Sequence, residues 1–155
     1  MRIHYALSTK YTIILAIAFL VTGYCTMRYV TQNAITQYGV EILKDIENAS
    51  PKQLIQYTVW AYNNKNYEVA ERLSIVTDGM NFDNWRKQYK VISIKEVDAF
   101  EEYKQLKQQF DYIKQYKVKL SYANGLFVKG YNIRDFIFVY DKKNSRWYLY
   151  GIGSY

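Results

Sequence analysis

The sequence has almost none of the side chains on which disulfides and metal sites depend. It contains one cysteine, Cys25, and one histidine, His4, both close to the N-terminus. A single cysteine cannot form an intrachain disulfide, and zinc sites require several histidine or cysteine ligands. The carboxylates do not cluster with calcium-ligand spacing, and Gly125 and Gly130 stand alone instead of forming a phosphate-binding loop. We therefore expect no metal site and no cofactor.

Catalytic side chains are also scarce. Because no histidine follows residue 4, acid–base chemistry near neutral pH would fall to carboxylates or tyrosines with strongly shifted pKa values. The candidates are Asp98, Asp111 and Asp135, each at an expected strand end or turn, where aspartate is common. We expect these side chains to be at least partly exposed, the interior to be filled by Tyr, Phe, Ile and Val, and no residue to be catalytic.

Aromatic residues, by contrast, are abundant, with 18 Tyr, 7 Phe and 3 Trp in 155 residues. This composition excludes a disordered chain, which lacks the apolar side chains that offset the entropy of ordering. The length leaves room for one domain of roughly 100 residues plus an anchor. Beyond residue 50 the chain has 17 Lys and Arg against 11 Asp and Glu. This excess favours anionic neighbours, or it keeps a small domain soluble.

The longest uncharged stretch lies near the N-terminus. Seventeen residues from Tyr11 to Met27 carry no charge, and basic residues bracket them. As a helix this stretch is about 25 Å long, at the short end of what spans a hydrocarbon core of roughly 30 Å. Interfacial tyrosines and snorkelling basic side chains make up the difference, and the basic residues before the stretch favour a cytoplasmic N-terminus. We predict a cytoplasmic tail at residues 1–10, a single transmembrane anchor in the cell membrane at 11–30, and a domain outside.

Two other interpretations of this segment remain open. A cleaved signal peptide is compatible with the short basic start and with the small residues in Val21-Thr22-Gly23. A lipid anchor on Cys25 is the second, although Tyr24 is large for the position before a lipidated cysteine. All three interpretations place the rest of the chain outside the membrane.

Residues 31–49 are predicted to form a stalk. Apolar residues recur there at helical spacing, as in a juxtamembrane or dimerising helix, and Gly39 weakens that helix. A boundary follows at Ser50-Pro51-Lys52-Gln53. Ser at the N-cap, Pro at the first helical position and Gln three residues after the cap form a capping box. The folded domain is predicted to begin here and to cover residues 50–155.

The period of the apolar residues changes along this domain. Helices are predicted from Pro51 to about Ala61, at 67–74 after a polar turn at 63–66, and near Trp85 after a turn at Asp78-Gly79. Strands are predicted at 89–97, 116–122, 136–140 and 146–152, with a turn at Asn124-Gly125. Residues 99–113 have helical spacing, but an extended excursion is the alternative. The order predicts an α+β fold, in which an N-terminal transmembrane helix precedes three helices packed on a curved antiparallel sheet. One core is expected to include Trp60, Leu73, Phe138 and Trp147.

Two segments carry a resemblance to a known superfamily. They are the helix pair YTVWAYNNKNYEVAERLS at 57–74 and the tail FIFVYDKKNSRWYLYGIGSY at 136–155. Residues 50–155 resemble the nuclear transport factor 2-like superfamily. The shared features are the polar break between the two helices and, in the last strand, a Trp followed by glycines. The resemblance implies a cone-shaped domain. It also implies likeness to membrane-anchored envelope proteins of Gram-positive bacteria, or to the bitopic assembly subunit of type IV secretion and conjugation machines.

One stretch mixes basic and aromatic residues in the pattern of a binding surface. Basic side chains among aromatic rings can grip polyanions, although the same pattern describes a solvated strand whose lysines protect a sheet edge. The residues of the predicted polyanion or partner surface are Lys104, Lys107, Lys114, Lys117, Lys119, Tyr112 and Tyr116. An anionic envelope polymer or a protein partner fits such a surface. Nucleic acid is not expected, because it would require DNA outside the cell.

Three functions follow from these features. The first is a membrane-anchored binding or scaffolding domain outside the cell, without catalytic activity, with a protein partner or as a homo-oligomer. The alternative is an assembly subunit of a conjugation or type IV secretion complex that uses stalk and domain for self-association. The third is an enzyme with a carboxylate and a tyrosine, such as Asp135 and Tyr131, in the cone; the fold alone does not decide between them.

Overall fold

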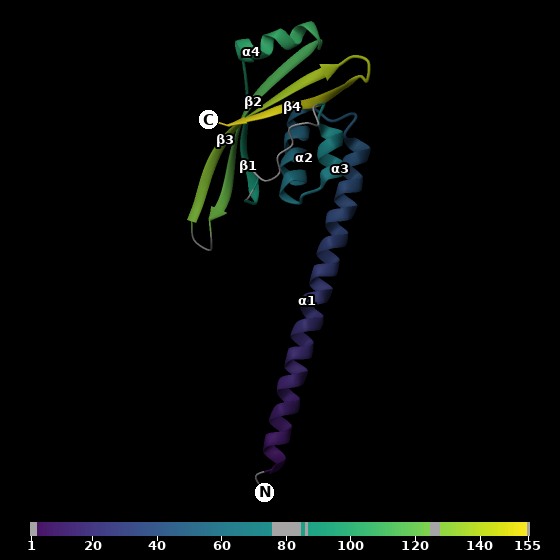
Figure 1. Cartoon of the computed structure of the whole chain (residues 1–155), viewed down its shortest axis with the longest axis vertical. Coiled ribbons are helices and arrows are strands. Elements are labelled where there is room, and N and C mark those ends of the chain that lie inside the picture. Colours follow the sequence, from purple (N-terminus) through teal and green to yellow (C-terminus); the bar gives the residue numbers. More distant parts are fainter. Residues whose placement is uncertain (1–2, 76–84, 86, 125–127, 155) are drawn as a thin grey trace. The chain divides into compact units, whose positions relative to one another are not determined.

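The computed structural model describes residues 3–75, 85, 87–124 and 128–154, and for 3–11, 102, 104, 123, 124, 128, 129 and 154 the backbone only. Its elements in chain order are α1 (Ile3–Asp45), α2 (Pro51–Asn63), α3 (Tyr67–Leu73), β1 (Tyr89–Val97), α4 (Glu101–Lys104), the 3-10 helix η2 (Gln105–Gln108), β2 (Tyr112–Asn124), β3 (Val128–Asp141) and β4 (Arg146–Ser154). The fold is α+β, as expected (Figure 1). The expected turn at Asp78-Gly79, most of the expected helix near Trp85, and Gly125 lie outside the described residues.

The chain forms two compact units, residues 1–38 and 39–155, and the boundary falls within α1. In the first unit, α1 is long and apolar enough from Thr12 onward to cross a membrane, and none of its apolar window is buried. Threonines in this unit turn their hydroxyls back to the helix, because Thr22, Thr26 and Thr31 donate to carbonyls four residues earlier at 2.8–2.9 Å. Such bonds satisfy polar groups that hydrocarbon would leave unpaired.

The second unit begins at Gly39, whereas we expected the domain to start at Ser50. The end of α1 belongs to the domain because Ile42, Ile46 and Ala49 are buried in its core. Gly39 allows this packing. A Cβ atom there would lie 3.0 Å from Nδ2 of Asn66 and 3.2 Å from the Trp60 ring. Ile42 and Ile46 of the predicted stalk therefore pack within their own chain.

The polar residues that precede α2 and α3 cap the first turns of these helices. Ser50 caps α2, because its hydroxyl accepts from the backbone N–H of Gln53 while the Gln53 side chain accepts from the Ser50 N–H at 2.9 Å. Asn66 caps α3 by accepting from the N–H of Val69 at 3.0 Å. The polar break between the two helices is confirmed.

The four strands form an antiparallel sheet in the order β1-β2-β3-β4. All four predicted strands are confirmed, but β2 and β3 are longer than the apolar pattern suggested, with 13 and 14 residues. The register shifts once in each edge strand, at Ile92 of β1 and at Tyr150 of β4. These shifts place an extra residue in the strand and increase the local twist.

The main core lies between one face of the sheet and the helices. Alternate residues of β2 and β3, among them Val118, Leu120 and Phe138, pack with apolar residues of α2 and α3, such as Leu54 and Leu73. The expected core is confirmed for Leu73 and Phe138, which are buried in this cluster, and for Trp60 and Trp147, which are partly buried against it. Figure 1 shows α2 and α3 on this side of the sheet.

Residues 99–110 cover part of the opposite face. Ile137 and Val139 are buried there, outside the main core. The N–H of Phe100 donates to the side chain of Gln115 at 3.0 Å, and the ring of Phe110 packs edge-on against Tyr150 with centroids 6.5 Å apart. Of the two alternatives left open for residues 99–113, the structure has helix at 101–108, in α4 and η2, and strand from Tyr112, where β2 begins. In Figure 1, α4 lies apart from α2 and α3, at one end of β2.

Candidate functional site

The predicted polyanion surface does not form one continuous patch. Successive residues of a strand point to opposite faces, so Lys114 and Tyr116 of β2 face the helices, whereas Lys117 and Lys119 face away. Tyr112 is exposed at the start of β2 and packs edge-on against Tyr140. Lys107 is exposed in η2, and the side chain of Lys104 lies outside the described part of the chain.

Tyr116, which we expected on the surface, is 2% exposed. Its hydroxyl donates to Glu96 at 3.0 Å, and Lys114 forms an ion pair with the same carboxylate at 3.2 Å. Burial raises the pKa of Tyr116, and so does the neighbouring charge of Glu96. Burial also tends to raise the pKa of Glu96, but the bonds from Lys114 and Tyr116 outweigh this effect and lower the pKa. These three residues join β1 to β2 and have a structural role.

The lysines that face away from the helices lie on an exposed part of the sheet. Pairing across β1, β2 and β3 places residues in three successive rows: Lys95–Lys117–Asp135, Ser93–Lys119–Ile133 and Lys90–Ser121–Tyr131. We call Lys90, Ser93, Lys95, Lys117, Lys119, Ser121, Tyr131 and Ile133 the open lysine face. Each row contains at least one lysine. The carboxylate in these rows belongs to Asp135, at the border with the part covered by residues 99–110.

The open lysine face combines charge with exposed apolar area. Tyr131 and Ile133 remain 58% and 48% exposed, and Lys119 holds its ammonium 4.5 Å from the centre of the Tyr131 ring. This cation–π contact fixes two of the side chains relative to each other. Lys95 and Lys117 lie directly opposite one another on neighbouring strands, an arrangement that is unfavourable for like charges. On its other side Lys117 lies opposite Asp135, so it has a like charge on one neighbouring strand and a carboxylate on the other.

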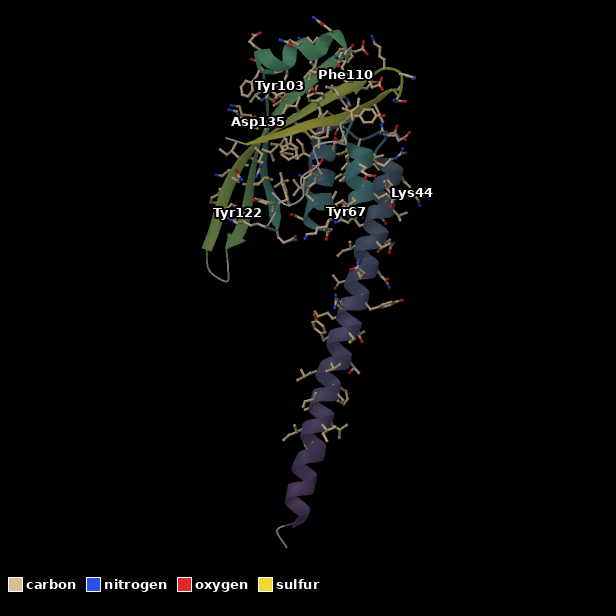
Figure 2. All side chains as sticks on the ribbon, viewed as in Figure 1. Lys44, Tyr67, Tyr103, Phe110, Tyr122 and Asp135 are labelled. Carbon is tan, nitrogen blue, oxygen red and sulfur yellow. The ribbon has the colours of Figure 1, made fainter. Side chains whose placement is uncertain are left out.

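Asp135 is buried, although we expected it to be at least partly exposed. It is 5% exposed and accepts a hydrogen bond from Nε2 of Gln115 at 3.1 Å. The Gln115 carbonyl in turn accepts from the N–H of Phe100. Because Gln115 satisfies both the carboxylate and the incoming backbone, the pair holds the segment before α4 against the sheet. Figure 2 shows Asp135 on β3, and Tyr103 and Phe110 in the segment that includes α4 and η2.

The other two candidate carboxylates lie at the surface, as expected. Asp98 is exposed, and Asp111 forms an ion pair with Lys142 at 2.5 Å. This pair joins the start of β2 to the turn between β3 and β4. It raises the pKa of Lys142 through the hydrogen bond to Asp111. Within the part of the chain that the structure describes, no group of three His, Cys, Asp or Glu side chains has the geometry of a metal site.

Asn63 has a larger role than its sequence pattern suggested. Its side chain donates to the carbonyl of Tyr89 at 2.7 Å, and its carbonyl oxygen accepts from the N–H of Tyr89 and from the indole of Trp85, both at 2.9 Å. The amide thus pairs with β1 as a neighbouring strand would and fixes Trp85 between Tyr62 and Tyr89. Sequence patterns identify Asn as a helix breaker but do not reveal a partner 26 residues away.

Arg146 is a second residue that the pattern did not single out. It is 7% exposed and donates to the carbonyl of Arg72 at 3.1 Å. Glu47 accepts from both Arg146 and Arg72, at 3.5 and 3.4 Å. A buried guanidinium needs such partners because an unpaired charge in the interior is strongly unfavourable. Arg146 therefore joins β4, α3 and the segment that follows α1.

Comparison with models of protein families, with curated proteins and with solved structures finds no match for this chain. The resemblance to the nuclear transport factor 2-like superfamily therefore stays a prediction.

Proposed function

We propose that this protein is a single-pass membrane protein whose folded unit binds an anionic partner outside the cell membrane, without catalysing a reaction. The observation that carries the proposal is the open lysine face, on which lysines recur in three successive rows of an exposed sheet surface. A basic surface of this kind raises the local concentration of anions and speeds their association. The proposal includes the cone-shaped fold that the resemblance of residues 50–155 implies.

The N-terminal segment supports the membrane part of this proposal. The uncharged residues 11–27 lie in α1, and the apolar side chains from residue 12 onward are exposed, as expected of a helix surrounded by lipid. Basic residues are concentrated before the segment, which favours a cytoplasmic N-terminus. The helix continues beyond the segment to Asp45, within the folded unit.

The titratable groups support a role without catalysis. Glu96 and Tyr116 join two strands, and Asp135 is bonded to the amide of Gln115. Tyr131, the tyrosine that the enzyme hypothesis requires, is exposed on the open lysine face. Self-association through the stalk also loses support, because Ile42 and Ile46 pack within the chain's own core.

The orientation can be tested by labelling single cysteines in intact cells. In a Cys25→Ser background, Lys143→Cys lies in the exposed turn before β4 and Ser8→Cys lies before the uncharged segment. A membrane-impermeant maleimide should label Lys143→Cys in intact cells and Ser8→Cys only after the cells are permeabilised. The reverse pattern would contradict the orientation, and a membrane-free product that lacks residue 8 would contradict the retained anchor.

Partner binding can be tested by photo-crosslinking in intact cells. A photoreactive amino acid at Ile133 lies on the open lysine face, and the same amino acid at Lys143 is the control. The proposal predicts an adduct from Ile133 that does not form from Lys143. Equal adducts from both positions, or none from Ile133, would show that this face does not bind a partner.

A further inference from the structure

We infer that the open lysine face binds a linear polyol-phosphate polymer of the cell envelope. This inference rests on the proposed function and names the chemical class of the partner. The polymer would lie along the direction of β2, with successive phosphates near lysines of successive rows and its polyol hydroxyls near Ser93, Ser121 and Tyr131.

The spacing of the lysines favours a polymer over a single phosphate group. Neighbouring rows are two residues apart on β2, which is about 7 Å, so the three rows extend over roughly 14 Å. One phosphate or one lipid headgroup reaches the lysines of a single row. A flexible chain with one negative charge per repeat can contact all three rows.

The type of cation fits phosphates that lie along a flexible chain. The basic residues of the open lysine face are lysines, which bind phosphate as point charges and do not impose a bidentate geometry. The planar fork of arginine, which binds carboxylate and phosphate alike in a fixed bidentate geometry, is absent from these positions. Arg146, which is buried, is bonded to Glu47 and to a backbone carbonyl.

The aromatic content favours a polyol chain over a single-stranded nucleic acid. Proteins that bind single strands stack successive bases on successive aromatic side chains. The open lysine face has one aromatic ring, Tyr131, and the ammonium of Lys119 lies over that ring. The next residue along β3 on the same face is Ile133, which offers no stacking surface. Lysines and hydroxyls, the groups a polyol phosphate needs, make up most of the remaining surface.

Binding can be measured with the full-length chain in detergent micelles and fluorescently labelled poly(glycerol phosphate) as the probe. The wild-type protein should bind the probe with an affinity that falls steeply with salt, because each neutralised phosphate releases counterions. The double variant Lys95→Gln and Lys119→Gln should weaken binding on the order of tenfold at low salt. The matched control, Lys107→Gln with Lys143→Gln, removes the same charge from exposed positions elsewhere and should bind as the wild type does.

The outcomes separate this inference from the proposed function. Equal weakening by the two double variants would show diffuse attraction and would overturn the inference. Tighter binding of oligo(dT) or of poly(glutamate), each matched in charge to the probe, would replace the polyol phosphate with that ligand. If the probe does not bind while the crosslink from Ile133 still forms, the ligand class is wrong and the proposed function stands. If the crosslink also fails, both are wrong.

Discussion

At the scale of single residues, side-chain amides join segments that are far apart in the sequence. Asn63 bonds to both backbone groups of Tyr89 and to the indole of Trp85, and Gln115 bonds to Asp135 and to the backbone of Phe100. An amide has donors and an acceptor in one plane, so one side chain can satisfy groups from two segments. Buried polar groups left without such partners cost about 1–3 kcal/mol each.

Asn63→Ala should therefore destabilise the folded unit by about 3 kcal/mol. The substitution leaves the N–H and carbonyl of Tyr89 and the indole N–H of Trp85 without their partner. The control is Asn64→Ala, which removes one bond to the carbonyl of Trp60 and should cost about 1 kcal/mol. Urea unfolding followed by Trp fluorescence measures both values. Equal losses of stability in the two variants would mean that the bonds from Asn63 to Tyr89 and Trp85 add nothing beyond ending the helix.

Tyr116→Phe gives a test that depends on pH. Burial raises the pKa of Tyr116 above its ordinary value of 10.0, so its stabilising effect is complete below pH 10 and is lost as the pH rises further. The Phe variant should be less stable at neutral pH because the bond to Glu96 is missing. Above pH 10 the difference should shrink by up to about 1.4 kcal/mol per pH unit, because only the wild type has a Tyr116 that ionises on unfolding. A difference that stays constant from pH 8 to 12 would contradict the assignment.

At the scale of elements, the last residues of α1 are part of a long helix and also pack in the core of the folded unit. Local propensity treats Gly39 as a weakness of the helix. In the folded unit, the missing side chain lets α1 approach Trp60 and Asn66, and this places Ile42 and Ile46 in the core. Close packing therefore outweighs the propensity cost at this position.

Gly39→Leu should destabilise the folded unit by about 1–3 kcal/mol, the usual cost of overpacking. The matched control is Gly23→Leu in the same helix, where a Cβ atom would meet nothing within 4 Å. That variant should leave the unfolding of the domain unchanged. Denaturation of both variants in the same detergent provides the comparison. A stabilised Gly39→Leu protein would show that propensity outweighs packing after all.

At the scale of the whole molecule, the net charge of +7 is distributed unevenly. Lys114 and Arg146 are paired with carboxylates, whereas Lys95 lies opposite another lysine on the open lysine face. Like charges at directly paired positions weaken a sheet, so Lys95 is expected to add little to the stability of the fold.

Lys95→Gln should therefore leave the free protein as stable as the wild type or slightly more stable, while polymer binding weakens. Salt should stabilise the wild type more than the variant, because it screens a repulsion that the variant lacks. The control is Lys143→Gln in the exposed turn, which should respond to salt as the wild type does. Thermal unfolding at low and high salt measures both effects. A clear loss of stability in Lys95→Gln would assign this lysine a structural role instead.

The sequence by itself determined the features that depend on neighbouring residues. The capping box at Ser50, the break before Asn66 and the strand alternation all act within about four residues, so their patterns predict the elements directly. The sequence also identifies the uncharged segment before Arg28 as a candidate membrane span, because length and hydropathy decide whether a helix can span a membrane.

Only the tertiary structure decided which surfaces remain exposed. Alternation divides Tyr116 and Lys117 between two faces, but it does not reveal which face the helices cover or where residues 99–110 lie. These choices bury Tyr116 and Asp135 and leave Lys119 and Tyr131 at the surface. The physical reason is that burial depends on packing between segments far apart in the chain, and no local pattern encodes those contacts.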